Sequence, residues 1–554
     1  MIYRQRAGRR AFFLSSAPWA ALALLLPAHA NAQSAPPPPP DPGVISSQVL
    51  EQQRERLDAL ETPADPGPAV TGERPADANV TGEDTIRFEL RTVVFDQSRF
   101  LSPQELSEVA APFVGRQVSF ADLGAITAAV NAMYDARGLV TARAILAPQA
   151  IENGTVRITL VEGVVGQIEV GGARRIAAQD IVNRSGLEPG ETLDPRDLER
   201  RLSLINRTNP VQVRAGLQPG EQFGLTDIQL AVTMPDPNIL QVFADNHGYR
   251  SVGRWEGGGY YRRTGLLGAS DRLSAFAVAS EGALSGTVSY DAAVLGPTTR
   301  LGLSYGRSRS EIVNGAFAAA GSVGKTQNLA LNYLQPVVSS ARGILLASAT
   351  VGVSETRNFV SDTFVSKTTT KKAGVGLSYD HLAPGFSLRV SGNALIADSP
   401  LTGSVSDQTY GVFSGTFEAE KRTGPRLGLR AFGGWQIATQ DGVPGDLLFQ
   451  IGGPLTNRGY EPGALSGDGG YYLSGEIEML PASDSAEPAI FVFVDHGRVA
   501  TPRDQPKSLT AIGAGIGFTA LDILSVQATA GFPVERLESQ SRNPQFYLRT
   551  TLQF

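Results

Sequence analysis

The chain ends with Phe546-Tyr547-Leu548-Arg549-Thr550-Thr551-Leu552-Gln553-Phe554, a stretch with a strict period of two. This period places Phe546, Leu548, Thr550, Leu552 and Phe554 on one face of a predicted strand. The last strand of an outer-membrane β-barrel closes against the first and shows lipid an apolar band edged by aromatic rings. Leu552 and Phe554 are therefore expected to act as the barrel assembly signal. For this stretch alone, an edge strand of a soluble sheet is the alternative.

The first 32 residues have the pattern of a secretory signal peptide. Four arginines between residues 4 and 10 precede an apolar stretch over residues 11–26, which is too short for a convincing membrane helix. Small residues follow, and the pattern fits cleavage after Ala30 or after Ala32. The pair Arg9-Arg10 resembles a twin-arginine signal, which exports folded proteins. We interpret it as incidental because a barrel reaches its membrane unfolded.

The composition excludes several classes of function. The 554 residues contain no cysteine, which excludes disulfides and thiolate metal sites, and only four histidines, which argues against a histidine metal site. The net charge of −6 gives no reason to expect nucleic acid as a partner. Gly302-Leu303-Ser304-Tyr305-Gly306 matches the nucleophile-elbow pattern, but Ser304 lies in an alternating strand with no predicted helix after it. We therefore expect no enzyme activity, no metal and no cofactor.

Residues 238–554 are dominated by alternating strands. In residues 524–532, apolar side chains occupy every second position, and small or polar residues lie between them. Sixteen strands can be placed, and alternate connections are short and polar, like the periplasmic turns of bacterial barrels. This region is therefore predicted to be a transmembrane β-barrel of 16 antiparallel strands. A soluble β-sandwich of this size is the alternative.

The region before the barrel divides into a Pro-rich segment and two similar modules. Residues 33–84 contain a run of prolines, a predicted helix over residues 45–60 with few apolar side chains, and a linker. Residues 85–162 and 163–236 each follow the order strand, helix, helix, strand, strand. Two small α+β domains are therefore predicted. The helix over residues 45–60 is expected to float free or to lie in a polar cavity.

Several motifs resemble those of the TpsB family of two-partner secretion transporters (ShlB/FhaC/HecB-like), which belongs to the BamA-type superfamily. Gly138-Leu139-Val140-Thr141-Ala142-Arg143-Ala144 is similar to the end of the family's first periplasmic POTRA domain. Asp197-Leu198-Glu199 with Leu204-Ile205-Asn206 resembles the second POTRA domain, and Asp245-Asn246-His247-Gly248 resembles the first barrel strand. The resemblance implies that the two modules are POTRA domains and that the preceding helix plugs the pore at rest. Whether it does so is left open by the sequence.

The most specific resemblance is Asn457-Arg458-Gly459-Tyr460, which is similar to the Val-Arg-Gly-Tyr/Phe motif at the tip of the family's sixth outer loop. Asn457 replaces the usual valine. The resemblance implies that this loop, over residues 440–469, folds into the barrel. Phe493-Val494-Asp495-His496-Gly497 is similar to the family's Phe-x-Asp-x-Gly motif in the thirteenth strand.

Period two predicts which of these side chains face the lumen. Because a carboxylate that faces hydrocarbon is costly, Phe493, Asp495 and Gly497 are expected to point inward. Arg458 and Asp495 are therefore predicted to form a charge-assisted pair that fixes the loop inside the barrel. Glu476 and Glu478 also point inward by alternation, and they either join this pair or line a wet lumen.

The resemblance implies an outer-membrane transporter with its POTRA domains in the periplasm. It is expected to receive a secreted TpsA-type exoprotein through these domains and to translocate it unfolded, without ATP. Outer-membrane lipid and, during biogenesis, the barrel-assembly machinery are the other expected partners. A BamA- or TamA-like barrel insertion factor is the alternative, because it shares the loop and strand motifs. The cargo stays open among adhesins, haemolysins, haem-binding proteins and toxins.

Overall fold

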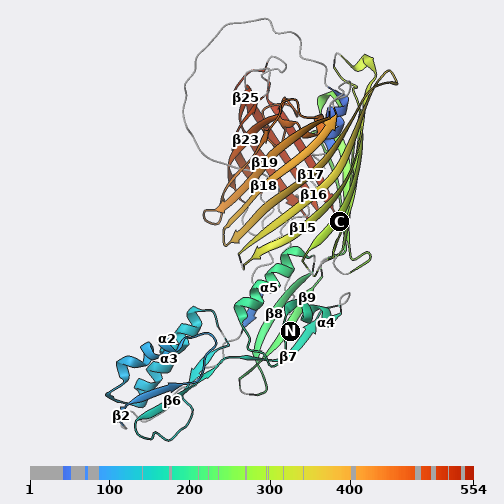
Figure 1. Ribbon diagram of the computed structural model, residues 1–554. Helices are drawn as coiled ribbons and strands as arrows, with labels where there is room; N and C mark the ends of the chain where they lie inside the picture. Colours follow the sequence, from blue (N-terminus) through green and yellow to red (C-terminus); the bar gives the residue numbers. More distant parts are fainter. Residues whose placement is uncertain are drawn as a thin grey trace. The chain divides into compact units, whose positions relative to one another are not determined.

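The computed structural model describes residues 41–50, 69–72, 87–400, 407–480, 488–500 and 507–554, apart from residues 140, 174–176, 210, 223, 235, 269, 270, 295, 297, 316, 341, 522 and 538–542. The predicted signal peptide lies outside the described residues, as do the run of prolines and most of the linker. The chain divides into two units. One holds the barrel with the N-terminal residues up to Thr62, and the other holds residues 63–235 with 339–341. Figure 1 labels the elements of both units.

Sixteen antiparallel strands form one closed barrel, as predicted. In chain order they are β10 (Asn238–Asp245), β11 (Glu256–Thr264), β12 (Arg272–Ser280), β13 (Ala283–Ala293), β14 (Arg300–Glu311), β15 (Ser322–Ser339), β16 (Gly343–Val360), β17 (Thr363–Ala383), β18 (Phe386–Pro400), β19 (Asp407–Arg422), β20 (Leu427–Ala438), β23 (Gly469–Met479), β24 (Ala489–Ala500), β25 (Lys507–Ala520), β26 (Leu524–Pro533) and β27 (Gln545–Gln553). The barrel closes where β10 pairs with β27, from Gln241 opposite Gln553 to Asp245 opposite Arg549. Phe554 extends this seam, because it exchanges backbone hydrogen bonds of 2.8 and 3.1 Å with Leu240.

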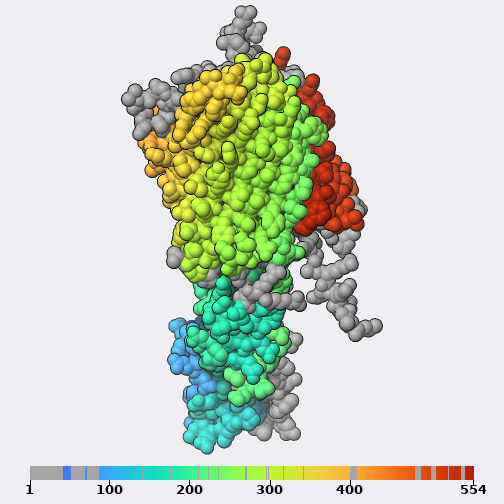
Figure 2. All heavy atoms as spheres, turned by 90° about the vertical axis from the view of Figure 1, so that its right-hand side faces the viewer, coloured from blue at the N-terminus to red at the C-terminus, as the bar shows by residue number. Residues whose placement is uncertain are grey.

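The two faces of the barrel wall differ as the alternation predicts. On β27, Phe546 and Leu548 are exposed on the outside, whereas Tyr547 is buried on the inside. Val351 and Val375, on β16 and β17, are also exposed, and Figure 2 shows the continuous outer face that the green and yellow strands form. Such an apolar outer face is suited to contact with lipid. Among the described residues, no helix has the length and apolar character needed to cross a membrane.

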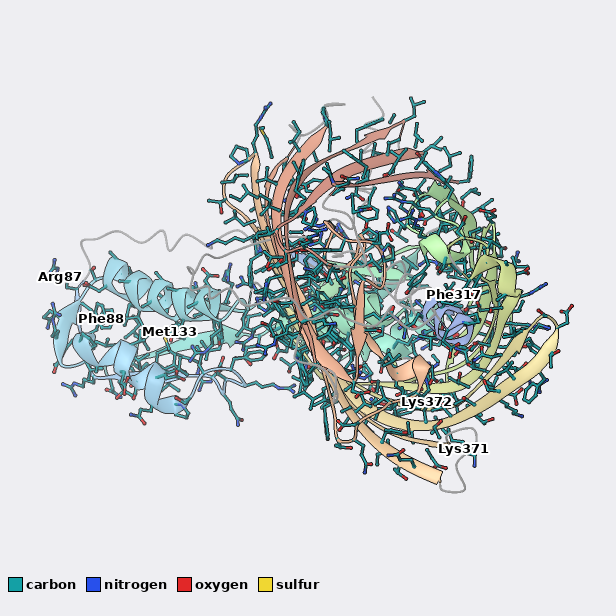
Figure 3. The ribbon with its side chains drawn as sticks, turned by 90° about the horizontal axis from the view of Figure 1, so that it is seen from above. Arg87, Phe88, Met133, Phe317, Lys371 and Lys372 are labelled. Atoms are coloured by element: carbon teal, nitrogen blue, oxygen red, sulfur yellow. The ribbon has the colours of Figure 1, made fainter. Side chains whose placement is uncertain are left out.

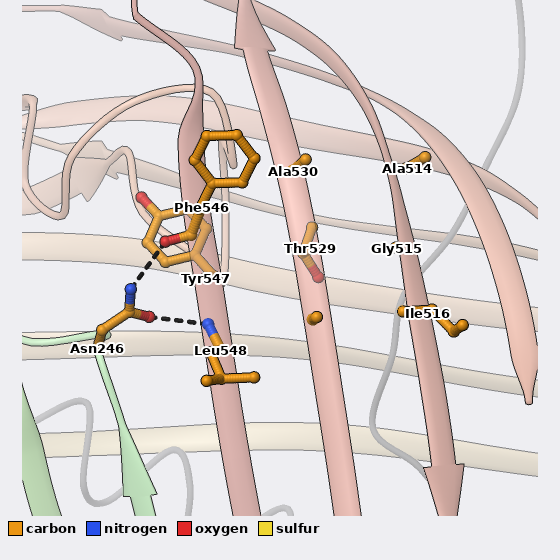
Figure 4. A pocket seen from close by; sticks show the side chains of 10 residues that line it. Asn246, Ala514, Gly515, Ile516, Thr529, Ala530, Phe546, Tyr547 and Leu548 are labelled. Atoms are coloured by element: carbon orange, nitrogen blue, oxygen red, sulfur yellow. Dashed lines mark hydrogen bonds between the residues drawn. The ribbon is translucent and has the colours of Figure 1, made fainter.

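Asn246 lengthens the short seam between β10 and β27. Its Nδ2 donates to the carbonyl of Phe546 at 2.8 Å, and the N–H of Leu548 donates to its Oδ1 at 2.8 Å (Figure 4). A groove of about 400 Å³ lies beside this bridge, lined by residues of β25, β26 and β27 that include Ala528 and Ala530. The backbone N–H of Asn246 also donates to the carbonyl of Leu548 at 3.2 Å, so this residue extends the seam beyond the end of β10.

The first module of the other unit follows the predicted order of strand, helix, helix, strand and strand, with a short strand, β4, added between the helices. Its elements are β2 (Phe88–Leu90), β3 (Thr92–Phe95), α2 (Pro103–Ala110), η1 (Ala111–Phe113), β4 (Arg116–Val118), α3 (Phe120–Ala136), β5 (Arg143–Ile145) and β6 (Thr155–Val161). The predicted first strand is divided in two at Arg91, since β2 pairs with β4 and β3 pairs with β6. Ser102 caps α2 in a capping box with Glu105, and the N–H of Ser102 holds the pKa of that carboxyl below its usual value.

The second module repeats this order with β7 (Val164–Gly171), α4 (Ala178–Ser185), α5 (Pro195–Thr208), β8 (Gln212–Pro219) and β9 (Leu225–Thr233). Its sheet has the strand order β1-β8-β9-β7. The additional strand, β1 (Val70–Gly72), comes from the segment predicted to be a linker. Three residues of the predicted linker are therefore paired into this sheet.

A helix over residues 42–50 belongs to the barrel unit. The sequence predicted a helix over 45–60, but the observed helix begins three residues earlier, and residues 51–60 lie outside the described part. The earlier start has a local cause. Asp41 accepts the N–H of Gly43 at 2.7 Å through its side chain, and Pro42 occupies the first helical position, where it is favoured.

Candidate functional site inside the barrel

The connection between β20 and β23, residues 439–468, is called loop 6 below. It contains η4 (Gly445–Leu447) and two short strands, β21 (Phe449–Ile451) and β22 (Leu465–Gly467), which pair with each other. Both short strands contact β24. Figure 3, seen from above, shows chain segments inside the ring of barrel strands. Loop 6 therefore folds back along the inner wall.

Arg458, at the tip of loop 6, is held by Asp495 of β24. Its Nε donates to Asp495 Oδ2 at 2.9 Å, and a terminal nitrogen donates to Oδ1 at 2.7 Å. The backbone N–H of Arg458 also donates to Asp495 Oδ2, at 3.0 Å. Both residues are buried, with 4% and 0% of their surfaces exposed. This is a bidentate, desolvated ion pair, in which the planar guanidinium matches the carboxylate.

Three further side chains complete the surroundings of Arg458. Glu476 accepts a hydrogen bond from the guanidinium and forms an ion pair with it, and Ser474 Oγ accepts another at 2.9 Å. Ser474 in turn donates to Asp495 at 2.5 Å. The guanidinium carbon lies 3.5 Å from the centre of the Phe493 ring, in a cation–π contact. Two carboxylates thus face one arginine in a buried site.

The two glutamates singled out from the sequence differ in position. Glu476 is 2% exposed and joins the network around Arg458, rather than lining a wet lumen. Glu478 lies two residues along β23 and is only half-buried. Ser474 was not singled out from the sequence. It faces Asp495 because β23 and β24 pair with Ser474 opposite Asp495, and inward alternation on β23 was the available signal.

Asn457 and Tyr460 fix the backbone on either side of Arg458. Asn457 is fully buried, and its Nδ2 donates to the carbonyl of Leu509 at 3.1 Å. The Tyr460 hydroxyl donates to the carbonyl of Thr510 at 3.0 Å, and Tyr547 donates its own hydroxyl to the carbonyl of Tyr460 at 2.5 Å. The tip therefore binds β25 and β27 as well as β24. Period two places Tyr547 on the face opposite Phe546 and Leu548, but nothing in the sequence indicated its contact with loop 6.

Glycines allow the tip to approach the wall closely. A Cβ atom at Gly531 of β26 would lie 2.1 Å from the carbonyl oxygen of Arg458. One at Gly459 would lie 2.7 Å from Ala511 Cβ, and one at Gly497 would lie 2.7 Å from Asn457 Oδ1. Real Cβ atoms do not make such contacts, so these positions require glycine for the observed backbone approach.

The helix over residues 42–50 contacts the inner wall and loop 6. Ser47 Oγ lies 3.3 Å from Thr326 Oγ1 of β15 and 3.2 Å from Thr356 Oγ1 of β16. Gln48 donates to the carbonyls of Gly445 and Leu448 in loop 6, at 2.9 and 3.2 Å. Figure 3 shows this short helix within the ring of strands.

No group of His, Asp or Glu side chains in the described part of the chain is arranged to hold a metal ion. The site is instead an internal contact between a loop and a wall.

A family model described as "Haemolysin secretion/activation protein ShlB/FhaC/HecB" matches residues 224–520, which is more than half of the chain. The chain belongs to this family. A second model, "POTRA domain, ShlB-type", matches residues 88–163, the first module. The protein is thus an outer-membrane transporter of the family, with a β-barrel in the outer membrane and POTRA domains in the periplasm.

Named relatives agree with this assignment. The "Outer membrane transporter CdiB" of Escherichia coli is 26% identical over 532 residues, which covers 88% of this chain and 85% of that protein. The "Heme/hemopexin transporter protein HuxB" of Haemophilus influenzae is 22% identical and covers 80% and 83% of the two chains. The solved structure of CdiB from Escherichia coli has a TM-score of 0.70 at 22% identity, over 93% of this chain and 99% of that one. At this identity the structural likeness shows the fold alone.

Proposed function

We propose that this family member receives a TpsA-type exoprotein in the periplasm, through its POTRA domains, and passes it unfolded through the barrel to the cell surface. The observation that carries the proposal is the pair of segments inside the lumen. Loop 6 is fixed to the wall by buried charges, whereas the helix over 42–50 is held by neutral groups. A lumen closed by one fixed segment and one removable segment suits a conduit that opens for a passing chain.

The proposed transport requires no nucleotide. The periplasm lacks ATP, so direction must come from the cargo itself. A cargo that folds only outside the cell releases free energy on that side alone, and folding there prevents its return. The POTRA domains supply the first contact, because an extended segment of the cargo can add a strand to a sheet edge.

The named residues then have defined roles. Asn457, Arg458, Gly459 and Tyr460, with Phe493, Asp495 and Gly497 on the wall, hold loop 6 in the conformation that transport requires. Glu476 shares the charge of Arg458, and Glu478 lines the lumen. Leu552 and Phe554, on the closing strand, present the signal that the barrel-assembly machinery reads during insertion into the lipid bilayer.

The test is export of the large secreted protein encoded beside the transporter gene. We expect that protein to reach the medium or the cell surface only when the transporter is co-expressed with it. A matched control replaces Ser304, the residue of the nucleophile-elbow pattern, with alanine, and export should then be unchanged. Export without the transporter would contradict the proposal. The absence of a gene for such a protein beside the transporter gene would also contradict it.

A further inference from the structure

Six exposed cations lie on the outward face of four neighbouring barrel strands. This group, called the basic band below, consists of Arg307 and Arg309 on β14, Lys325 on β15, Arg357 on β16, and Lys367 and Lys371 on β17. The residues next to them in the chain, such as Ser308 and Thr326, are buried, so alternation turns the cations away from the lumen. Lys371 and Lys372, labelled in Figure 3, show this alternation, because Lys372 pairs with Asp446 of loop 6 at 2.7 Å whereas Lys371 is exposed.

The basic band lies at the outer end of the barrel, next to apolar side chains. β10 follows the second POTRA module in the chain and so starts on the periplasmic side, and β14, the fifth strand of the antiparallel barrel, runs outward as β10 does. The exposed Tyr305 comes before Arg307 on β14, and the exposed Val375 follows Lys371 on β17. Figure 2 shows this face of the barrel in green and yellow. The band therefore lies where the headgroups of the outer leaflet meet the barrel.

Two pairs of like charges stand directly opposite each other in the basic band. Arg309 is in register with Lys325, and Arg357 is in register with Lys367. Like charges that lie directly opposite on neighbouring antiparallel strands destabilise a sheet. An isolated cation at the edge of an apolar belt needs no partner, because its long side chain can reach the interface. The two pairs, in contrast, are stabilised by an anion that binds both members of a pair.

The chain supplies only part of that negative charge. Glu311 binds Arg309 at 3.0 Å, and Glu355 lies 2.6 Å from each member of the second pair. The third carboxylate of this face, Asp398 of β18, lies opposite Lys371. Six cations thus face three carboxylates at this height in the described part of β14 to β18. The band keeps an excess of positive charge that an external anion can neutralise.

Arg307 adds to this excess. It lies between Gly286 of β13 and Gln327 of β15, so neither of the residues directly opposite it is a carboxylate. Its guanidinium has the planar geometry that binds phosphate through two parallel hydrogen bonds, whereas a lysine binds phosphate as a point charge. Both kinds of phosphate-binding side chain are therefore present in the band.

The spacing of the two like-charge pairs selects the kind of anion. The ammonium of Lys325 lies 4.5 Å from the centre of the Phe359 ring, two residues from Arg357, so the two pairs lie at a similar height. They are two strand spacings apart, which is roughly 10 Å. This is about the length of a disaccharide. A disaccharide with a phosphate at each end would place one phosphate on each pair.

We propose that the basic band binds lipid A, the diphosphorylated disaccharide glycolipid of the outer leaflet. One phosphate would lie on Arg309 and Lys325 and the other on Arg357 and Lys367, with the acyl chains along the apolar face below them. A glycerophospholipid headgroup with a single phosphate fills only one of the two pairs. This inference goes beyond the proposed function, because it depends only on the outer-membrane location of the barrel and assigns a lipid to one sector of its wall.

Lipid binding to the purified full-length transporter in detergent tests the site. Native mass spectrometry should show that diphosphoryl lipid A binds about tenfold more tightly than monophosphoryl lipid A or phosphatidylglycerol, because each of these lacks the second phosphate. Inorganic phosphate should not displace the lipid at equal concentration, because it has no acyl chains to bury. Equal binding of the two forms of lipid A would overturn the inference. Displacement by inorganic phosphate would also overturn it, since the band would then be a site for free anions.

Lys325→Gln/Lys367→Gln removes one cation from each pair and leaves both arginines in place. This variant should bind diphosphoryl lipid A about tenfold more weakly than wild type. Without lipid it should unfold at the same temperature as wild type or slightly higher, because the repulsion between opposite cations is removed. Added lipid A should raise the unfolding temperature of wild type and barely change that of the variant. A purely structural role of the two lysines would instead lower the stability without lipid and leave lipid binding unchanged.

The matched control is Arg263→Gln/Arg498→Gln, which removes two exposed arginines outside the basic band. Arg263 lies at the periplasmic end of β11, and Arg498 lies at the outer end of β24. This control should bind diphosphoryl lipid A as wild type does. Wild-type binding by Lys325→Gln/Lys367→Gln would overturn the inference. An equal loss in the control would also overturn it, since the total charge of the barrel would then attract the lipid.

Discussion

Loop 6 and the helix over residues 42–50 both occupy the lumen, but they are held by different kinds of interaction. The tip of loop 6 places a buried guanidinium between two carboxylates and presses its backbone against glycines of the wall. The helix contains no charged residue from Pro42 to Leu50, and its polar contacts are neutral hydrogen bonds of Ser47 and Gln48.

This difference indicates which segment can leave. A neutral hydrogen bond exchanges with water at a net cost of about 1 kcal/mol, so a few such bonds can break and re-form. Breaking a buried ion pair leaves an uncompensated charge, at a cost of about 3–5 kcal/mol. The helix is therefore the segment suited to removal, and loop 6 is suited to remain as a fixed part of the wall.

The largest expected effect comes from Arg458→Ala or Asp495→Ala. Each variant leaves the remaining charges buried without their main partner, at a cost of about 3 kcal/mol, and export should fall steeply in both. The barrel should still assemble, because its closure depends on β10 and β27. Two quantities are measured: the amount of partner secreted, and the amount of barrel whose electrophoretic mobility changes on heating, which reports assembly. Arg498→Ala, an exposed arginine on β24, is the control and should export normally.

The double variant Arg458→Ala/Asp495→Ala sharpens this prediction. If the two residues act as one unit, the double variant should export no less than either single variant. Additive losses would show independent roles and would remove the contrast between a charge-locked loop and a neutral helix.

The next effect is expected from deleting residues 33–60, which removes the helix but spares β1. Ion conductance in planar bilayers should rise several-fold, because the helix lies within the ring of strands, and export should be largely kept. Conductance equal to that of wild type would show that the helix does not limit the pore.

Gly531→Ala should have a smaller effect than the loss of Arg458. The new methyl group would meet the carbonyl oxygen of Arg458, and relieving such an overlap typically costs about 1–3 kcal/mol. Export and the thermal stability of the barrel should both decrease. Gly517→Ala is the control, since its nearest neighbour would lie 3.8 Å away. Similar behaviour of the two variants would contradict the tight backbone contact.

The smallest effect is expected from Gln48→Ala, which removes two hydrogen bonds to loop 6 at about 0.5 kcal/mol each, the low end of the net range for neutral hydrogen bonds. Open events in single-channel recordings should become a few times more frequent, while export stays normal. A collapse of export would mean that the helix and loop 6 act as one body, and the contrast between them would then be lost.

The barrel was predictable because period two is a local property of each strand. Alternation, together with the cost of a carboxylate that faces hydrocarbon, assigned Asp495 and Glu476 to the inner face, and the terminal aromatic residue indicated closure. Alternation does not say which inward residues meet. Ser474 faces Asp495 through the register of β23 against β24, and Tyr547 reaches Tyr460 across loop 6. The first contact depends on strand register and the second on the three-dimensional path of loop 6, and neither is a local property of one strand.

The N-terminal elements were harder to predict, for different reasons. The helix begins before the predicted residue 45 because Asp41 and Pro42 form a favourable start, and Ser47 lies within the helix, where it contacts the wall. β1 was missed because three residues among prolines carry little signal of their own. Their pairing comes from Glu199 and the edge of β8, which lie more than a hundred residues away.

The pairing of β1 with β8 also sets the length of the chain segment that tethers the helix over residues 42–50. While β1 is bound, at most the 19 residues between Leu50 and Val70 tether the helix, a reach of roughly 70 Å when fully extended. Once β1 is released, the tether runs on to Phe88 at the start of β2, and its reach nearly doubles to roughly 130 Å. The pairing of β1 with β8 therefore removes nearly half of the chain length that could otherwise separate the helix from β2.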